Sequence, residues 1–475
     1  MMELFTDKPG DEGLPGRERA FVMAATMTTT LMAVFDGTMV NIALPSMAHA
    51  MQVSANVAVW FANGYLLSAA MTLAIFAALA TRFGYRPVYL FGLALFTLAS
   101  LGCAFSASPE MLIGMRVLQG IGSAATLSIA PAILRSVFPG RLLGRILGLN
   151  ALLIASSTAI APVLGGTLLE TLSWQWLFAI NLLPGSIALY LASRAIPRKT
   201  SGVSAPFDTV GAVLSVALLG ALIMAANSLS EAHATTHGIS QMTMGWAGIA
   251  LVSAVAFIWH IRRVQAPLLP PAMFNNGRFS LAALTSLASF VSQGITFIAL
   301  PFLFQSVYGY SALTSALLFT PWPVGIVLVA PHAGRLADKY SPSLISTLGL
   351  LVFVAGLTLL ATLPEQASPL NIGLRSLVCG MGFGCFQSPN NREMLSNVCR
   401  DYASYASGVL SIVRTFGQCL GAAVVGVLLA VMASGASRIL EAQAVRLSLW
   451  VAVGCCAAAV VMSVSRLRKH QQAAV

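Results

Sequence analysis

Long apolar stretches, each about as long as a bilayer is thick, recur along the whole chain. A helix needs about 20 mainly apolar residues to cross the hydrocarbon core, and runs of this kind account for most of the 475 residues. Only 9% of the residues are charged, whereas soluble domains carry about 25%. Only helices or closed barrels can span a bilayer, and barrels use alternating segments of about 10 residues. The sequence therefore predicts an all-α polytopic membrane protein.

Fourteen membrane-spanning helices are expected from these runs. They are placed at 20–44, 56–80, 87–106, 110–134, 144–169, 175–195, 208–228, 244–262, 279–306, 311–332, 343–362, 370–390, 404–433 and 446–466. The polar residues 1–19 lack the apolar core of a signal peptide and are expected to form a cytoplasmic tail. With an even number of spans, the tail at 467–475 is cytoplasmic as well.

The distribution of Lys and Arg supports this topology. With the N-terminus inside, 21 of the 26 basic residues fall in or beside cytoplasmic segments, and only Arg438 and Arg446 fall outside. Cytoplasmic loops are enriched in Lys and Arg, so one missed span would invert every later loop. Topology thus explains the formal net charge of +11, which does not indicate a nucleic-acid partner.

Two pairs of short segments repeat at a nearly constant offset. "ALATRFGYRP" (78–87) resembles "RLADKYSPSL" (335–344), and "GMRVLQGIG" (114–122) resembles "GLRSLVCGMG" (373–382). Transporters are often built from repeated halves. We therefore expect three parts: a six-helix bundle at 20–199, a linker with two further helices at 200–276, and a second six-helix bundle at 277–466.

One carboxylate falls inside a predicted span, and an arginine lies at a similar depth. Asp36 precedes the outer end of the first span, and Arg116 follows the outer start of the fourth. At 1.5 Å per residue both lie roughly 9–12 Å deep. A membrane charge costs about 2.5–3.5 kcal/mol even on insertion scales, so such residues are usually functional. We predict that Asp36 takes up and releases a proton and that Arg116 is its charged partner. The alternative is a static ion pair that fixes the packing of the two helices.

Aromatic and amide side chains on several spans could form a substrate surface. Phe290, Gln293 and Phe297 lie on one helical face, and aromatic faces bind organic cations. Arg414 lies ten residues into its span with Gln418 one turn on, and it must face the interior. Core packing is the alternative for each residue. The candidates, besides Asp36, are Trp60, Asn63, Tyr65, Phe290, Gln293, Phe297, Trp322, Gln387, Asn390 and Arg414.

Glycine and proline within two spans are candidates for gating. Small residues let helices approach closely, and a proline interrupts the backbone ladder. We predict that the unit formed by Pro162, Gly165 and Gly166 is a hinge at the outer side, and Gly120 a close-packing position. Ordinary membrane packing is the alternative for each single glycine.

Several segments match, in order, the motifs of a known transporter family. They are "DGTMVNIALP" (36–45), "WFANGYLL" (60–67), "RVLQGIGSA" (116–124), "APVLGG" (161–166), "WQWLFAINLLPG" (174–185), "PLLPPAMFNNGRF" (267–279), "PFLFQSVYGYSAL" (301–313), "GRLADK" (334–339), "CGMGFGCFQSPNN" (379–391) and "VRTFGQCLGAA" (413–423). The chain resembles the major facilitator superfamily, with its six-plus-six helices. The additional pair is similar to the fourteen-helix drug:proton antiporter branch, the quaternary-ammonium and methyl-viologen exporters.

This resemblance implies a proton-driven multidrug efflux antiporter that exports lipophilic, cationic compounds by alternating access. It implies a monomer in a bacterial cytoplasmic (inner) membrane that uses the proton gradient, without a cofactor, a bound metal or enzymatic activity. The motifs add Asn41 and Gln119 to the substrate candidates. They assign gating roles to Arg82, Gly84, Arg86, Gly334, Arg335 and Asp338.

Departures from the family pattern affect the inner gate. The family usually has Gly and Asp where this chain has Ala77 and Thr81. The Asp is expected to latch the inner gate, so the latch of the N-terminal half is altered here. Its counterpart in the second half, Asp338, is retained.

Other functions remain open. Arg116, Arg375 and Arg414 outnumber Asp36 within the spans, which favours neutral or anionic cargo. A proton-coupled importer of a metabolite would use the same fold, although the fifth-helix motif is associated with antiport. A membrane enzyme would need a polar catalytic cluster, whereas the histidines are scattered over both sides without metal spacing.

Overall fold

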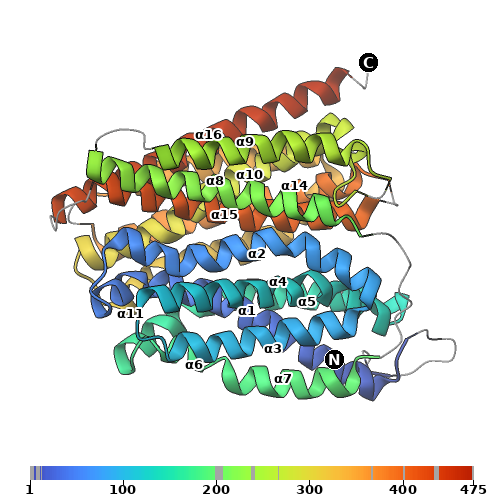
Figure 1. Cartoon of the computed structure of the whole chain (residues 1–475). Helices are drawn as coiled ribbons and strands as arrows, with labels where there is room; N and C mark the ends of the chain where they lie inside the picture. Colours follow the sequence, from blue (N-terminus) through green and yellow to red (C-terminus); the bar gives the residue numbers. More distant parts are fainter. Residues whose placement is uncertain are drawn as a thin grey trace.

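The computed structural model describes residues 5–6, 11, 13–197, 207–236, 241–265, 267–364, 367–399, 402–432 and 438–472. Their secondary structure is helical, with long α-helices lying side by side along a common direction (Figure 1). Parts of the predicted tails and the predicted boundary at 199–200 lie outside the described residues.

The first helices are α1 (Gly16–Ala50), α2 (Ala55–Phe83), α3 (Tyr85–Ala104), α4 (Pro109–Val137), α5 (Gly140–Thr171), α6 (Trp176–Ala179) and α7 (Leu182–Ala195). Then follow α8 (Thr209–Thr236), α9 (Gln241–Ile261) and the short 3-10 helix η2 (Pro271–Asn275). The remaining helices are α10 (Gly277–Phe302), the π-helix η3 (Leu303–Val307), α11 (Ala312–Phe319), α12 (Pro321–Lys339), α13 (Pro342–Ala361), α14 (Pro369–Ser396), α15 (Ala403–Met432) and α16 (Arg438–Gln472).

The predicted spans fall on these helices. Within the described residues, 13 helical segments are long and apolar enough to cross a membrane. The remaining predicted span, 370–390, falls on α14, which is 28 residues long but includes Arg375, Arg392 and Glu393. The prediction of an all-α polytopic chain is confirmed. The placement of the termini relative to a membrane stays a prediction.

Three predicted spans are interrupted. The span at 175–195 consists of α6 and α7, with Asn181 between them. The span at 311–332 breaks at Thr320, because the next residue, Pro321, has no backbone N–H to donate. The span at 279–306 passes from α10 into a π-helical turn that includes Gln305. Such π turns occur frequently at functional sites.

Two groups of helices pack within themselves. The N-terminal group comprises α1 to α7 and the C-terminal group α10 to α16. The groups meet chiefly where α2 packs on α15 and where α5 packs on α11. An apolar core spans this junction and includes Leu44, Phe61, Leu300 and Phe319. This junction between the two groups, called the seam below, therefore lies inside the molecule. The helices that form it are α1, α2, α5, α10, α11 and α15.

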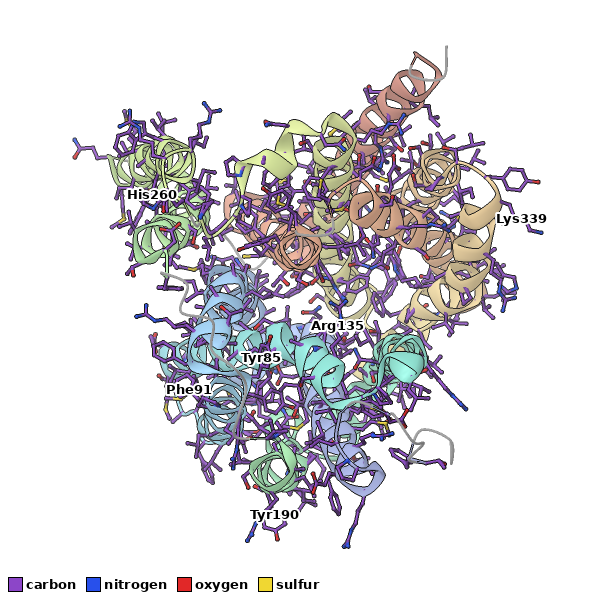
Figure 2. The ribbon with its side chains drawn as sticks, turned by 90° about the vertical axis from the view of Figure 1, so that its right-hand side faces the viewer. Tyr85, Phe91, Arg135, Tyr190, His260 and Lys339 are labelled. Carbon is purple, nitrogen blue, oxygen red and sulfur yellow. The ribbon has the colours of Figure 1, made fainter. Side chains whose placement is uncertain are left out.

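The helix pair α8 and α9 lies beside this seam. The two helices pack on each other, and α8 also contacts α2 and α15. Figure 2 shows the molecule along the helices. His260 of α9 lies at its periphery there, away from Tyr190 and Lys339. Asp208, at the start of α8, accepts hydrogen bonds from the N–H groups of Gly211 (2.8 Å) and Leu268 (3.0 Å). Its Oδ1 also lies 2.6 Å from Nε2 of His260, so one carboxylate ties both helices to the next segment.

Candidate functional site

Asp36 is completely buried in α1, and its carboxylate binds side chains from two other parts of the chain. Arg116 of α4 forms an ion pair with Oδ2 through Nη1. Gln119, one turn further along α4, donates to Oδ1 at 2.7 Å. Asn181, between α6 and α7, donates to the same oxygen at 3.4 Å. The carboxylate therefore joins α1 to α4 and to the break in the sixth span.

Arg116 extends these contacts to α2. Its Nε donates to the carbonyl oxygen of Phe61 at 2.7 Å, and its Nη1 donates to Oε1 of Gln119 at 2.6 Å. The guanidinium lies 4.5 Å from the ring centroid of Tyr65 and 5.6 Å from that of Phe178. Hydrogen bonds between ionised groups are about twice as strong as neutral ones. The charge of Asp36 thus bears on the contact between α1 and α4, whereas the bond of Arg116 to α2 goes to a neutral carbonyl oxygen.

A second layer of polar contacts surrounds the pair. Gln119 Nε2 also donates to Ser100 Oγ of α3 at 2.9 Å. The Tyr65 hydroxyl lies 2.7 Å from Ser123 Oγ. Gly120 packs directly on α2, where an added Cβ would lie 2.3 Å from the carbonyl oxygen of Tyr65. The close approach at Gly120 explains how Arg116 and Gln119 reach the interior from one face of α4.

The predicted aromatic substrate residues pack with one another in the C-terminal group. The ring centroids of Phe297 and Trp322 are 5.5 Å apart, as are those of Phe290 and Phe383. Trp322 is completely buried, and Phe290 and Phe297 are almost so. Gln293 accepts a hydrogen bond from Gln418 of α15 at 2.9 Å. Their contacts are those of a packed core, and their role in substrate binding stays a prediction.

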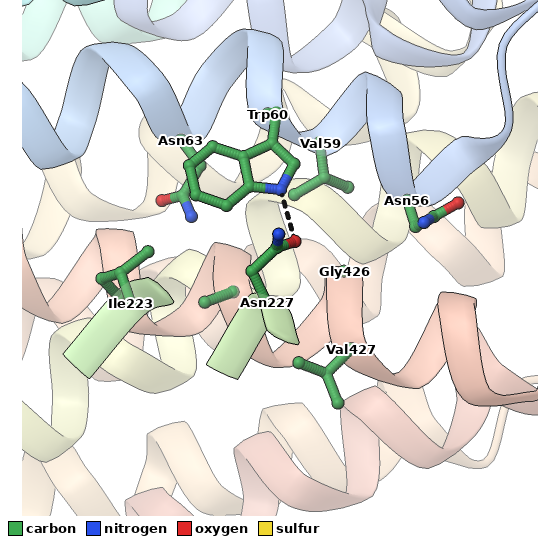
Figure 3. Close-up of a pocket in the computed structure, with 9 residues that line it drawn as sticks. Asn56, Val59, Trp60, Asn63, Ile223, Asn227, Gly426 and Val427 are labelled. Carbon is green, nitrogen blue, oxygen red and sulfur yellow. Dashed lines mark hydrogen bonds between the residues drawn. The ribbon is translucent and has the colours of Figure 1, made fainter. Parts of the chain in front are cut away.

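Trp60 and Asn63 face the seam between α2, α8 and α15 (Figure 3). Trp60 Nε1 donates to Asn227 Oδ1 of α8 at 2.8 Å. Asn63 Oδ1 accepts a contact from Cys419 Sγ of α15 at 2.9 Å. These two residues therefore help to join the helix pair and the two groups. Tyr65, the neighbouring candidate on α2, instead contacts Arg116 within the N-terminal group.

The other amide candidates have separate surroundings. The side-chain oxygen of Asn41 is buried without a hydrogen-bond partner among the described residues. Gln387 is half-buried in α14. Asn390, in the same helix, donates to Ser286 Oγ at 2.7 Å and accepts from Arg466 at 2.8 Å. The structure brings Asp36, Tyr65, Arg116 and Gln119 together, whereas Asn390 belongs to a different network.

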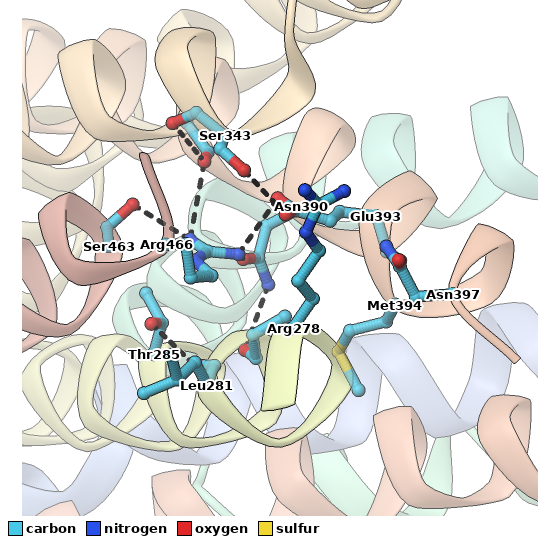
Figure 4. A network of polar contacts seen from close by, with 12 residues as sticks. Arg278, Leu281, Thr285, Ser343, Asn390, Glu393, Met394, Asn397, Ser463 and Arg466 are labelled. Carbon is cyan, nitrogen blue, oxygen red and sulfur yellow. Dashed lines mark hydrogen bonds and ion pairs between the residues drawn. The ribbon is translucent and has the colours of Figure 1, made fainter. Parts of the chain in front are cut away.

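A second buried ion pair joins α14 to α16, and the sequence did not predict it (Figure 4). Arg466 Nη1 lies 3.0 Å from Glu393 Oε2, and both side chains are buried. Ser343 of α13 donates to Glu393 Oε1 at 2.5 Å, and Arg466 also donates to Ser463 Oγ at 2.8 Å. The span predictions at 370–390 and 446–466 placed these residues beyond or at the helix ends. The sequence holds one hint of this polar network: Glu393 follows Asn390 by three residues, so the two side chains lie on one face of their helix.

The predicted inner-gate residues lie at helix junctions. Gly84, between α2 and α3, has a φ of +91°, a conformation that favours glycine. The Arg82 guanidinium lies 5.6 Å from the ring centroid of Phe83. Arg86 donates to the carbonyl oxygen of Ser193 in α7. Thr81 is exposed and its hydroxyl donates to the carbonyl of Ala78, within its own helix.

Their second-half counterparts lie on α12. An added Cβ at Gly334 would lie 3.0 Å from Ser388 Oγ, and Arg335 is exposed. The Asp338 side chain lies outside the described part of the chain. The gating roles of all these residues stay predictions.

At the other end, the groups meet through α1, α5, η3 and α11. Gln305 Nε2 donates to the carbonyl oxygen of Ile42 at 2.7 Å, and Ser46 Oγ donates to Gln305 Oε1 at 3.1 Å. Gly165 lies against Met39, and Gly166 lies against the backbone of Leu313. Pro162 stands one turn before these glycines, within α5. The predicted hinge unit thus lies on the contact between the groups.

Replacing Gly166 with leucine should open this contact. An added Cβ would lie only 2.8 Å from the Leu313 Cα and 3.0 Å from the carbonyl oxygen of Ala312, and backbone atoms cannot yield as a flexible side chain does. We expect several-fold faster passive proton leak in proteoliposomes that hold no cargo. Gly114→Leu is the matched control, because Gly114 has open space around its Cβ position. Equal leak in the two variants would contradict a sealing role for the contact.

Comparisons with known proteins show which family has this architecture. The family model described as Major Facilitator Superfamily matches residues 26–422. "Uncharacterized transporter YebQ" of Escherichia coli (strain K12) is 37% identical over 419 residues, which are 88% of this chain and 91% of that protein. "Tetracenomycin C resistance and export protein" of Streptomyces glaucescens is 30% identical over 88% of this chain and 77% of that protein.

A solved structure supports the same assignment at the level of the fold. A POT family transporter in complex with 5-aminolevulinic acid has a TM-score of 0.69 and 13% identity, over 96% of this chain and 98% of that one. Because the family model matches well over half of the sequence, the assignment is firm. The chain belongs to the Major Facilitator Superfamily of membrane transporters.

Proposed function

We propose that this protein is a proton-driven antiporter that exports small lipophilic compounds by alternating access. The observation that carries the proposal is the completely buried Asp36 of α1, on which contacts from α4 and the α6–α7 junction converge. The relative named for tetracenomycin C resistance and export supports the direction of transport. The proposal includes a six-plus-two-plus-six arrangement and cytoplasmic termini. It also includes a monomer in a bacterial inner membrane that needs no cofactor.

Protonation of Asp36 would weaken the contacts that hold α1. A charged carboxylate accepts from Arg116, Gln119 and Asn181. A neutral carboxyl group loses the ionic attraction and turns one oxygen into a donor. Arg116 would keep its bond to the carbonyl of Phe61 in α2. The proton therefore releases α1 while α2 and α4 stay joined.

The same helix carries the contact between the two groups. Ile42 and Ser46 of α1 bind Gln305, and they follow Asp36 by about two and three turns. A movement of α1 at Asp36 would therefore reach this contact through a rigid element. We propose that proton binding at Asp36 biases the closure of the groups in this way, because coupling requires an element with two arrangements.

The charge of the cargo has two candidates. The family resemblance favours lipophilic cations such as quaternary ammonium compounds. The surplus of interior arginines over acidic residues favours neutral or anionic compounds. A test of function must therefore use cargo of each charge.

Proton movement in reconstituted vesicles tests the proposal. The full chain is placed in liposomes that contain a pH-sensitive dye and methyl viologen, a neutral dye or an organic acid. Cargo that leaves down its gradient should draw protons inward and acidify the lumen, whereas protein-free vesicles show only passive exchange. Cotransport would instead make the lumen alkaline, so the sign separates antiport from import. If no cargo of any charge moves protons, the proposal is wrong.

A further inference from the structure

The three arginines within the predicted spans differ in their partners. Arg116 is paired with Asp36. Arg375 donates from Nε to Asn371 Oδ1 at 2.6 Å and also binds the carbonyl oxygen of Leu359. For Arg414, the described part of the chain supplies neither a hydrogen bond nor an ion pair. Arg414 is thus the interior cation whose charge the described residues leave unmatched.

Arg414 lies in a helix that packs close to the proton site. It stands about 16 Å along α15 from Ala403, near the middle of the helix. Its side chain is half-buried. Its helix, α15, packs on α2, the helix that carries Tyr65. Since Tyr65 also packs on Arg116, the helix of Arg414 lies against a helix that borders the Asp36 site.

An unpaired guanidinium in this position needs a negative partner. Arginine stays charged in proteins, and charges within membrane spans mark substrate or ion pathways. Asp36 is already bound to Arg116, and Glu393 to Arg466. The planar guanidinium matches a carboxylate with two parallel hydrogen bonds. We infer that the exported compounds carry a carboxylate, and that Arg414 binds this group.

The neighbours of Arg414 fit an amphipathic acid. Gln418, one turn further along α15, is half-buried and donates to Gln293 of α10 at 2.9 Å. Leu410, one turn before Arg414 on the same helical face, is partly buried against an apolar cluster that includes Met394 of α14. A carboxylate on Arg414 would thus lie between amide groups and apolar side chains. An acid with a lipophilic body matches both.

This inference rests on the proposed antiport and has an electrical consequence. Exchange of one monoanion outward for one proton inward moves two charges in the same direction. Exchange of one monovalent cation for one proton moves none. An inside-negative potential would therefore speed export of the acid and leave the cation exchange unchanged.

Binding to three probes of the same shape tests the role of Arg414. The probes share a pyrene ring and a four-carbon chain and end in a carboxylate, a hydroxyl or a trimethylammonium group. Their fluorescence anisotropy is measured with the purified full chain in detergent at neutral pH. We expect the carboxylate to bind at least about tenfold more tightly than the alcohol, as for a hydrogen bond to a charged group. Arg414→Gln should remove this preference and leave the affinity for the alcohol unchanged.

Two further arginine variants control the experiment. Arg375→Gln should keep the carboxylate preference, because Arg375 already has partners in the chain. Arg414→Lys keeps the charge without the planar fork and should show a smaller preference. If Arg414→Gln loses its affinity for the alcohol as well, the carboxylate preference of Arg414→Lys is the deciding measurement. Tighter binding of the trimethylammonium probe, or an undiminished preference in both Arg414 variants, would overturn the inference.

The outcomes also separate this inference from the proposed function. If the carboxylate binds through Arg414 but no probe moves protons, antiport is wrong and the recognition site stands. If the trimethylammonium probe drives proton movement and the carboxylate does not, antiport stands and the inferred cargo is wrong.

Discussion

Replacing Asp36 with asparagine is expected to reduce cargo-driven proton movement to the level of protein-free vesicles. Asparagine has nearly the shape of aspartate, and its oxygen can still accept from Arg116 or Gln119. It cannot take up a proton in the working pH range, so the whole coupling should disappear rather than a fraction of it. The dye-loaded vesicles described above measure this loss. Binding of the neutral pyrene alcohol should persist and show that the variant is folded.

Ser100→Ala is the matched control for Asp36→Asn. It removes a partner of Gln119 from the same network and leaves the titratable group in place. Proton movement should therefore continue in this variant. Coupling at the wild-type rate in Asp36→Asn would show that another group carries the proton. Glu393, buried against Arg466, would then be the next carboxylate to replace.

The sequence predicted the Asp36–Arg116 pair because depth along a helix can be counted. Each residue adds 1.5 Å, so two residues counted from the same membrane face can be compared without knowing how the helices pack. The structure places them in contact. Asn181 was not predicted because the sixth span was treated as continuous, whereas the break between α6 and α7 places this side chain beside Asp36. The proton-coupling role of these residues is still a prediction.

The environment of the aromatic residues could not be predicted from spacing. Helical periodicity shows that Phe290, Gln293 and Phe297 share a face, but it does not show what that face contacts. The structure packs Phe290 and Phe297 into an aromatic core with Trp322. Trp60 bonds to Asn227, which is 167 residues away in the chain. Such long-range partners are set by tertiary packing, which local sequence patterns do not record.

The second ion pair was missed because the ends of helices are the least certain part of a span prediction. The span predicted at 370–390 continues as α14 to Ser396, so Glu393 lies within a helix. The span predicted to end at 466 continues as α16 to Gln472. Arg466 was counted among the cytoplasmic charges, a placement that stays a prediction, and a buried partner was therefore not considered for it. Buried charges near the ends of spans therefore need the structure to be recognised.

Replacing Arg466 with methionine should destabilise the protein by about 3–5 kcal/mol, because removal of one partner leaves a buried charge uncompensated. Glu393 would keep its bond from Ser343 and lose the guanidinium. Asn390 would lose a donor as well. Reversible unfolding by denaturant in mixed detergent micelles measures the change. Each folded molecule should still exchange protons, because Asp36 is untouched.

The double variant Arg466→Met, Glu393→Leu separates a lost ion pair from a general packing defect. Replacing both members of a buried pair with apolar residues is often neutral or stabilising by about 1–4 kcal/mol, so the double variant should regain most of the stability that Arg466→Met loses. If the pair only fills space, the two substitutions should add. A cost below about 1 kcal/mol for Arg466→Met would also contradict a strong pair. Recovery of stability would show that Arg466 is needed because Glu393 is buried opposite it, and that this second carboxylate serves to hold α14 against α16.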